Sequence, residues 1–219
     1  MNSAATTNRR VESHQPISLT ELIKGLSGLV SPLVVDDSTM ITELCDDSRV
    51  VSPSSMFVAI KGEKHDGHKS VSEAVKNGAV AVVVEKGAIE QMALLDLNTS
   101  VIEVDDTRAA LASLASAFYR DPASDMIMVG ITGTNGKTTV SYLIEQTLIE
   151  LGVQTGVIGT VEYRYRLSDG QCIRQPAPLT TPDPLTLQKM LRTMADSGVS
   201  HVIMEASSHA LQQHRLGTI

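Results

Sequence analysis

A glycine-rich loop at residues 130–139, GITGTNGKTT, contains the residues of this chain best suited to chemistry. The apolar segment 126–129 precedes it as a short buried strand, and apolar residues recur at helical spacing over 140–151. In such a loop, backbone N–H groups approach phosphate oxygens, Lys137 reaches the β- and γ-phosphates, and the Thr138 hydroxyl binds Mg²⁺. The loop therefore predicts a site for a nucleotide phosphate, with ATP and Mg²⁺ as cofactors.

The loop departs by one position from the general pattern G-x-x-x-x-G-K-[ST]. That pattern requires glycine at position 131, where this chain has Ile131. The alternative is a strand-to-helix turn without a ligand, which would leave the lysine and the two threonines without a role. We expect the cofactor to be bound by the second half of the loop: Gly133, Thr134, Asn135, Gly136, Lys137, Thr138 and Thr139.

A carboxylate ends a second strand-like segment, His201–Glu205. The carboxyl end of a parallel strand beside a phosphate loop is a good position for a magnesium ligand. Thr138 and Glu205 are therefore candidate metal ligands, and together with Lys137 they form the candidate catalytic set. His209 and His214 are five residues apart and do not share a helical face, so we interpret them as structural.

Two further patterns precede and follow the loop. Upstream are Asp47-Ser48-Arg49, the apolar run 56–62 and Asp66-Gly67-His68, each of them ordinary turn chemistry when taken alone. Downstream, the segment 180–184, TTPDP, opens a helix with an apolar face. Its hydroxyl and N–H groups are suited to an anion, although an N-cap followed by proline in the first turn explains the pattern equally well.

Strand-like and helix-like segments alternate along the chain, which predicts an α/β fold with mostly parallel, doubly wound sheets. We expect helices over 18–29, 71–77, 88–95, 108–119, 140–151 and 184–197, strands over 41–44, 56–60, 79–84, 101–104, 126–129, 155–159 and 201–205, and a hairpin around 167–170. A polar segment containing proline, 121–124, is a candidate linker. The predicted divisions are a flexible terminus at 1–16, a small domain at 17–120, and part of a nucleotide-binding domain at 125–219.

Composition excludes several classes of protein. The 219 residues are 42% apolar, enough for packed cores, and this length favours two domains over one. A formal charge of −7 without a Lys/Arg cluster argues against a nucleic-acid partner. Cys45 and Cys172 are far apart, which supports neither a disulfide framework nor a zinc site and favours a reducing cytoplasm. We expect no transmembrane helix, no secretory signal and a monomer.

The loop at 132–139, TGTNGKTT, resembles the ATP loop of the Mur ligases and of their relative folylpolyglutamate synthase, enzymes that form amide bonds with ATP. The upstream D-S-R and D-G-H patterns resemble the N-terminal, UDP-binding domain of the Mur ligases. The run EASSHALQQHR at 205–215 resembles their E-[AV]-S-S-H-x-L-x-Q-x-R segment. These signatures follow in the same order over most of residues 41–215.

The resemblance implies a set of substrate-binding residues. Asp46 and Ser48 would contact the uridine end, and Glu63, Lys64 and His65 the diphosphate and uracil region. On the muramyl peptide side, the implied residues are Thr180, Thr181, Ser207, Gln213 and Arg215, and Arg215 can pair with a carboxylate in bidentate fashion. At position 179, where the family often has asparagine, this chain has Leu179.

The implied activity is that of an ATP-dependent amide ligase in the cytoplasmic synthesis of peptidoglycan precursors. It would add meso-diaminopimelate or L-lysine to UDP-N-acetylmuramoyl-L-alanyl-D-glutamate through an acyl phosphate. The alternatives are the family member that adds D-alanyl-D-alanine, folylpolyglutamate synthase, and a non-catalytic nucleotide-binding module. The family's carbamylated lysine, later histidine and third domain have no match here, so we expect a piece of a longer ligase that is inactive by itself.

Overall fold

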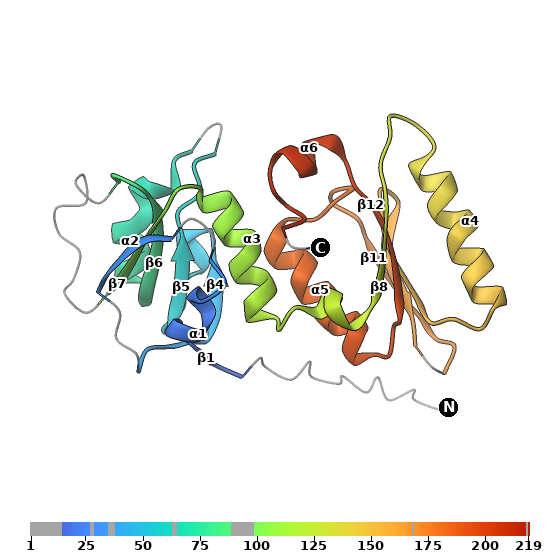
Figure 1. Ribbon diagram of the computed structural model, residues 1–219, viewed down its shortest axis with the longest axis horizontal. Helices are drawn as coiled ribbons and strands as arrows, with labels where there is room; N and C mark the ends of the chain where they lie inside the picture. Colours follow the sequence, from blue (N-terminus) through green and yellow to red (C-terminus); the bar gives the residue numbers. More distant parts are fainter. Residues whose placement is uncertain are drawn as a thin grey trace, which may run out of the picture.

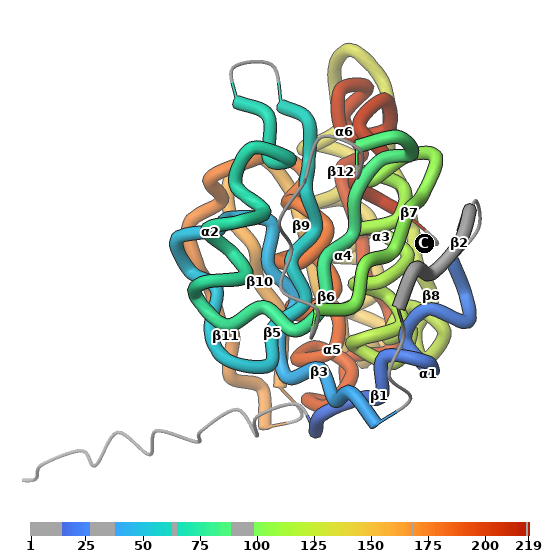
Figure 2. The backbone as a smooth tube through the Cα atoms, turned by 90° about the vertical axis from the view of Figure 1, so that its left-hand side faces the viewer, coloured from blue at the N-terminus to red at the C-terminus, as the bar shows by residue number. Residues whose placement is uncertain are grey.

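The computed structural model contains two α/β units, and each is built around its own five-stranded sheet (Figure 1). The structure describes residues 15–26, 29–34, 38–62, 65–88, 99–167, 169–217 and 219, with the backbone alone for 29–34. The first sheet lies before the segment 121–124 and the second lies after it. Figure 2 looks along the long axis of the molecule, with the first unit in front of the second.

The first sheet has the strand order β2-β7-β6-β5-β4. Its strands are β2 (Leu29–Val34), β7 (Ser100–Val104), β6 (Ala79–Glu85), β5 (Ser55–Val58) and β4 (Glu43–Cys45). Strand β2 runs antiparallel to β7, whereas the other neighbours are parallel. A separate two-stranded ribbon joins β1 (Ile17–Ser18) to β3 (Met40–Ile41).

Helices cover the first sheet on both faces. One apolar cluster unites α1 (Leu19–Ile23) and α3 (Thr107–Phe118) with residues of the sheet, among them Ala81 and Val83. A second cluster joins α2 (Val71–Lys76) to the alternate residues Val82 and Val84. Because successive side chains of a strand point to opposite faces, the apolar run 79–84 within β6 fits a strand that is buried on both sides.

The second sheet has the order β11-β10-β9-β12-β8. Strands β8 (Ile127–Ile131), β12 (His201–Glu205) and β9 (Thr155–Ile158) are parallel, and the hairpin of β10 (Glu162–Arg166) and β11 (Cys172–Pro176) extends the sheet in antiparallel fashion. Helix α5 (Pro184–Asp196) buries its apolar side chains against one face. Helix α4 (Lys137–Glu150) lies against the strands at the other face, and a short helix α6 (Ser208–Gln212) follows β12 (Figure 1).

Helix α4 contacts its sheet through polar side chains. Its buried residues are Ser141 and Glu145, whereas Leu143 is 64% exposed. The single Nε–H of Arg164 on β10 is shared between the two carboxylate oxygens of Glu145, at 3.0 and 3.2 Å. The Arg164 Nη2 forms an ion pair with the same carboxylate at 2.6 Å, and both side chains are at most 5% exposed. The guanidinium also lies 4.2 Å from the centroid of the Tyr142 ring. A buried ion pair and a cation–π contact thus help to hold α4 against the sheet, whose residues Val157 and Ile203 are also buried.

The two units contact each other through α3 and α5. Leu185 of α5 packs against the main apolar cluster of the first unit. Near the end of the chain, a side chain at Gly217 would meet Ala112 of α3, and His214 lies 3.8 Å from Asp106. The junction is therefore made partly of apolar packing and partly of polar contacts at the ends of helices.

The α/β class is confirmed, and several predicted elements need correction. The helix predicted over 18–29 ends at Ile23, and the strand predicted over 41–44 is divided between β3 and β4. Strand β2 was not predicted; it contains Pro32 and lies at the sheet edge, where proline is tolerated. Most of the helix predicted over 88–95 and of the terminus at 1–16 lies outside the described residues. No helix in the described ranges has the length and apolar character needed to cross a membrane.

Candidate active site

The candidate active site lies at the carboxyl edge of the parallel strands in the second sheet. Glu205 at the end of β12 is in register with Ile131 at the end of β8, and Met204 is in register with Ile158 at the end of β9. The segments that follow these three strands therefore leave the sheet at one edge. This is where ligands bind in open α/β sheets.

The glycine-rich loop connects β8 to α4 without a side-chain cap on the helix. Gly136 precedes the helix with φ +80° and Gly133 has φ +140°, both in the region that favours glycine. The Lys137 ammonium donates to the Gly133 carbonyl at 2.6 Å and so folds back over the loop. Because no side chain caps α4, its first N–H groups remain available to an anion.

Glu205 lies beside this loop and is 1% exposed. Its Oε2 accepts hydrogen bonds from the hydroxyls of Thr138 at 3.2 Å and Thr160 at 2.8 Å. A Cβ atom at Gly159 would collide with Oε1, so only glycine leaves room for this carboxylate. The structure thus brings Thr138 and Glu205, the two predicted metal ligands, into direct contact.

The residues at this edge fit ATP and Mg²⁺. An ammonium, uncapped N–H groups and a buried carboxylate with a neighbouring hydroxyl are the donor set that Mg²⁺-bound phosphates use. Among the described residues, no group of three or more His, Cys, Asp or Glu side chains is arranged to hold a metal by itself. A cation bound by Thr138 and Glu205 would therefore take further oxygen ligands from phosphate and water.

Thr181 joins the predicted peptide-binding residues to the end of β12. Its hydroxyl donates to the Glu205 carbonyl at 2.8 Å and accepts from the Ser207 N–H at 3.1 Å. Arg215 donates from Nη1 to the Thr181 carbonyl at 3.1 Å, and from Nε and Nη2 to the Gln213 side chain. The four predicted peptide-binding residues Thr181, Ser207, Gln213 and Arg215 therefore form one hydrogen-bonded group next to the candidate metal ligand Glu205.

Two of the predicted peptide-binding hydroxyls have different surroundings. Ser207 caps α6 by accepting from the Ala210 N–H, which occupies one lone pair of its oxygen. The hydroxyl of Thr180 lies 3.2 Å from that of Thr160, at the exposed side of the group. The Thr180 hydroxyl therefore reaches the Glu205 carboxylate through Thr160, whereas the Thr181 hydroxyl contacts the Glu205 carbonyl directly.

Three residues predicted for the UDP end, Asp46, Ser48 and His65, are described by the structure and lie in the first unit. Ser48 is buried and donates to Glu73 of α2 at 2.6 Å, and its carbonyl accepts from Asn77. His65 makes a hydrogen bond of 3.1 Å with Ser70 just before the same helix. Glu63 and Lys64 lie outside the described residues. The hydroxyl oxygen of Ser48 can still accept a hydrogen bond from a ligand.

The carboxyls of Asp46 and Asp47 have pKa values shifted in opposite directions. The pKa of Asp46 is raised, because loss of solvation disfavours the charged form and because Asp183 of the second unit adds a like charge. The pKa of Asp47 is lowered to about 2, because Arg49 donates side-chain and backbone hydrogen bonds to it; His65 adds a smaller favourable charge. Asp47 is thus kept in its charged form mainly by its hydrogen bonds from Arg49.

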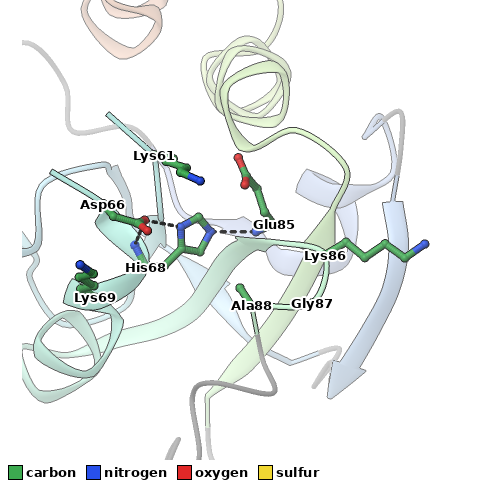
Figure 3. A pocket seen from close by; sticks show the side chains of 8 residues that line it. All are labelled: Lys61, Asp66, His68, Lys69, Glu85, Lys86, Gly87 and Ala88. Atoms are coloured by element: carbon green, nitrogen blue, oxygen red, sulfur yellow. Dashed lines mark hydrogen bonds and ion pairs between the residues drawn. The ribbon is translucent and has the colours of Figure 1, made fainter. Parts of the chain in front are cut away.

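A polar pocket adjoins the loop that follows β5 (Figure 3). Inside it, His68 is held between the Asp66 carboxylate at 2.7 Å and the Glu85 N–H at 3.0 Å. The imidazole thereby fixes the loop to the end of β6. The remaining lining residues are Lys61, Lys69, Lys86, Gly87 and Ala88.

Thr160 and His68 were not predicted as site residues. The sequence carries no signal for Thr160 like that for Glu205, because Glu205 is the last residue of β12 whereas Thr160 lies two residues beyond the end of β9. His68 was noted only as part of a turn pattern. Its role as a hydrogen-bonded bridge depends on the Glu85 N–H, which is seventeen residues away along the chain.

Comparison with known proteins finds two matching family models. Residues 131–219 match the "Mur ligase middle domain", and residues 41–119 match "Mur ligase family, catalytic domain". The N-terminal and middle parts of one family thus follow each other in the chain.

Similar curated proteins carry one name. The chain is 47% identical over 182 residues to the "UDP-N-acetylmuramoyl-L-alanyl-D-glutamate–2,6-diaminopimelate ligase" of Listeria monocytogenes, covering 83% of this chain and 35% of the relative. It is 40% identical over 201 residues to the protein of that name from Phocaeicola vulgatus, covering 92% of this chain and 39% of the relative. The chain therefore spans little more than a third of the length of these relatives.

Solved structures agree with the fold. A structure of a ligase of the same name has a TM-score of 0.68 and 25% identity, over 94% of this chain and 39% of that one. The Acinetobacter baumannii ligase that carries "D-alanyl-D-alanyl" in its title has a TM-score of 0.57 and 21% identity, over 90% of this chain and 38% of that one. The second likeness supports the fold alone.

Proposed function

Because this chain belongs to the Mur ligase family, we propose that it carries the UDP-substrate-binding and nucleotide-binding parts of an ATP-dependent ligase. The proposed substrates are UDP-N-acetylmuramoyl-L-alanyl-D-glutamate and a diamino acid, either meso-diaminopimelate or L-lysine. The names of the similar curated proteins support the first of these amino acids. The proposed location is the cytoplasm, the proposed state is a monomer, and the proposed product is a peptidoglycan precursor.

The observation that carries the proposal is the contact between Thr138 and Glu205 beside Lys137. In the proposed reaction, the side-chain carboxylate of the substrate's D-glutamate attacks the γ-phosphorus of ATP, and ADP leaves. The amine of the second substrate then attacks the acyl carbon and expels phosphate. Both steps move negative charge onto phosphate oxygens, so they require neutralising groups more than a protein nucleophile.

The chain's own residues would supply that neutralisation. Lys137 would leave the Gly133 carbonyl to bind the β- and γ-phosphates, and the uncapped N–H groups of α4 would bind their oxygens. Thr138 and Glu205 would hold Mg²⁺, which lowers the repulsion between the attacking carboxylate and the triphosphate when it is bound. Arg215 would use its remaining N–H groups for a substrate carboxylate.

For the UDP end, we propose contacts from Asp46, Ser48, Glu63, Lys64 and His65, and for the muramyl peptide from Thr180, Thr181, Ser207, Gln213 and Arg215. The described members of the first set are in the first unit, and the second set lies at the carboxyl edge of the second sheet. The substrate would thus extend from one unit to the other, with its glutamate end beside the glycine-rich loop.

Isothermal titration of the 219-residue chain tests this assignment. We expect ATP·Mg²⁺ and UDP-N-acetylmuramoyl-L-alanyl-D-glutamate each to bind with one-to-one stoichiometry. UDP-N-acetylmuramoyl tripeptide is the comparison ligand, and tighter binding of it would favour the ligase that adds D-alanyl-D-alanine. Binding of ATP without either UDP compound would contradict the proposal and favour a folate-type ligase or a nucleotide-binding module.

A further inference from the structure

Thr160 lies between the two halves of the proposed site. Its hydroxyl donates to Glu205 Oε2 at 2.8 Å and lies 3.2 Å from the hydroxyl of Thr180. Glu205 is the candidate metal ligand, and Thr180 is a candidate contact of the peptide substrate. The hydroxyl of Thr160 is therefore the direct side-chain link between these two residues.

The direction of this hydrogen-bond chain follows from the donors present. An ionised carboxylate only accepts, so the single proton of the Thr160 hydroxyl is directed to Glu205. The contact with Thr180 must then use the Thr180 proton, with the Thr160 oxygen as acceptor. The chain runs from Thr180 through Thr160 to Glu205, and the Thr180 oxygen remains able to accept from a substrate.

The surroundings hold Glu205 so that this link can affect its orientation. Its Oε1 lies over Gly159, where a Cβ atom would collide with it, and its Oε2 is shared by the Thr138 and Thr160 hydroxyls. The carboxylate is buried, so loss of one of two hydrogen-bond donors is not replaced by bulk water. Movement of Thr180 would therefore be transmitted to the oxygen that also contacts Thr138.

We propose that Thr160 is a positioning residue that couples the peptide-substrate segment to the metal ligand Glu205. Binding of the UDP-peptide at Thr180 would fix the Thr160 hydroxyl and hence the orientation of Glu205 that ATP·Mg²⁺ requires. The inference rests on the proposed function. It predicts a measurable dependence of ATP·Mg²⁺ affinity on the UDP-peptide, and it assigns that dependence to one hydroxyl group.

The test is a titration of ATP·Mg²⁺ with and without saturating UDP-N-acetylmuramoyl-L-alanyl-D-glutamate. For the unsubstituted chain we expect affinity to rise by about fivefold or more when the UDP-peptide is present, the lower end of typical coupling between sites. Thr160→Val keeps the shape and removes the hydroxyl, so this ratio should fall to within about twofold of unity, the value for uncoupled sites. Thr160→Ser keeps the hydroxyl and should retain most of the ratio.

Two controls separate positioning from damage to the fold. Thr147→Val removes a hydroxyl that donates to Leu143 within α4, and it should leave the ratio unchanged. The melting temperature of Thr160→Val should remain close to that of Thr160→Ser. If Thr160→Val melts far lower, the ratio in Thr160→Ser decides: a ratio near unity there would overturn the proposal.

The outcomes distinguish this inference from the proposed function. If the unsubstituted chain binds neither ligand, the proposed function fails and the inference fails with it. If both ligands bind but their affinities are independent, or if Thr160→Val retains the full ratio, the inference alone is overturned. The inference is supported if the affinity ratio falls to near unity in Thr160→Val and stays close to that of the unsubstituted chain in Thr160→Ser.

Discussion

The helices of the two units contact their sheets through different kinds of side chain. In the first unit, α1 and α3 on one face and α2 on the other all contact the sheet through apolar side chains. In the second unit α5 does so, whereas α4, whose buried residues are Ser141 and Glu145, is held by the buried pair of Arg164 and Glu145. On α4 the Leu143 side chain is 64% exposed, and Leu151 just after the helix is 73% exposed.

The helices α3 and α4 also differ at their amino termini, where one is capped by a side chain and the other is open to a ligand. Helix α3 begins with Asp106, whose carboxylate accepts from two backbone N–H groups, so its amino terminus is satisfied within the protein. Helix α4 begins after Gly136 without a side-chain cap. An ion pair fixes α4 on its sheet with a defined geometry, while its amino terminus is kept open for phosphate.

Substitution of Arg164 should give the largest loss of stability. Arg164→Leu leaves the Glu145 carboxylate buried without its partner, which typically costs about 3–5 kcal/mol. The measurement is hydrogen exchange of the α4 amides, which reports the free energy of opening in that region.

Two comparison variants make this result specific. Arg174→Leu removes a neighbouring arginine that is 58% exposed, and it should change the free energy by less than about 1 kcal/mol. The double variant of Arg164→Leu with Glu145→Leu should recover most of the loss, because no unpaired charge remains. A loss below about 1 kcal/mol for Arg164→Leu alone would show that α4 is held by other contacts.

Leucine substitutions on α3 and α4 should differ for the same chemical change. Leu114 of α3 is fully buried, so Leu114→Ala should lower the free energy of unfolding by about 2–5 kcal/mol. Leu143 of α4 is largely exposed, and Leu143→Ala should remain within about 0.5 kcal/mol of the unsubstituted chain. Urea unfolding followed by circular dichroism measures both, and equal losses would refute the contrast between the two helices.

Removal of the α3 cap should have a smaller effect. Asp106→Ala leaves the N–H groups of Arg108 and Ala109 without their acceptor and should cost about 1 kcal/mol. Asp106→Asn retains a capping oxygen and serves as the control. Because no side chain caps α4, we expect ATP·Mg²⁺ binding to stabilise α4 and not α3 against hydrogen exchange; equal protection of both helices would contradict the contrast.

The smallest effect concerns the junction of the two units. The pKa of Asp46 is raised in the folded state, so the folded chain binds more protons than the unfolded chain above the ordinary aspartate pKa of 3.8. Stability contributed by this group is present below that value and is lost as pH rises through the folded-state pKa. As pH rises from 3.8 through the folded-state pKa, the free energy of unfolding should therefore fall less steeply in Asp46→Asn than in the unsubstituted chain.

Asp47→Asn is the control of opposite sign. Arg49 lowers the pKa of Asp47 to about 2, so its contribution to stability is present above the ordinary value and is lost as pH falls towards 2. Acid titration of the melting temperature compares the two variants. Identical pH profiles for both would contradict the assignment of the Asp46 shift to its surroundings and Asp183.

Sequence patterns correctly predicted those helices and strands whose own residues favour the structure that they adopt in the fold. The run 79–84 became a central strand buried on both faces, and the helix predicted over 108–119 formed with Asp106 as its cap. Strand β2 was not predicted; it contains Pro32, which is compatible with a strand only at an edge, and edge position is a property of the assembled sheet. The burial of Glu145 on α4 depends on its pairing with Arg164, a residue on a strand that periodicity alone does not relate to α4.

For the candidate site, the sequence predicted groups on each segment but not their connections. Lys137, Thr138 and Glu205 could be proposed from the loop and from a strand end; the structure brings the Thr138 hydroxyl to Glu205, and the Lys137 ammonium contacts the Gly133 carbonyl. Thr160 could not be identified from its own surroundings in the sequence, because its two partners are 20 and 45 residues away. Contacts between strand ends follow from the sheet order, which periodicity does not provide.

The most direct test of the two-site account is ligand affinity in two variants of the chain, Lys137→Ala and Ser48→Ala. We predict that Lys137→Ala weakens ATP·Mg²⁺ binding by tenfold or more, about the value of a charge-assisted hydrogen bond, and leaves UDP binding within about twofold. Ser48→Ala should weaken UDP binding and leave ATP·Mg²⁺ binding unchanged. Loss of both ligands in either folded variant, or of neither ligand in both, would contradict the account.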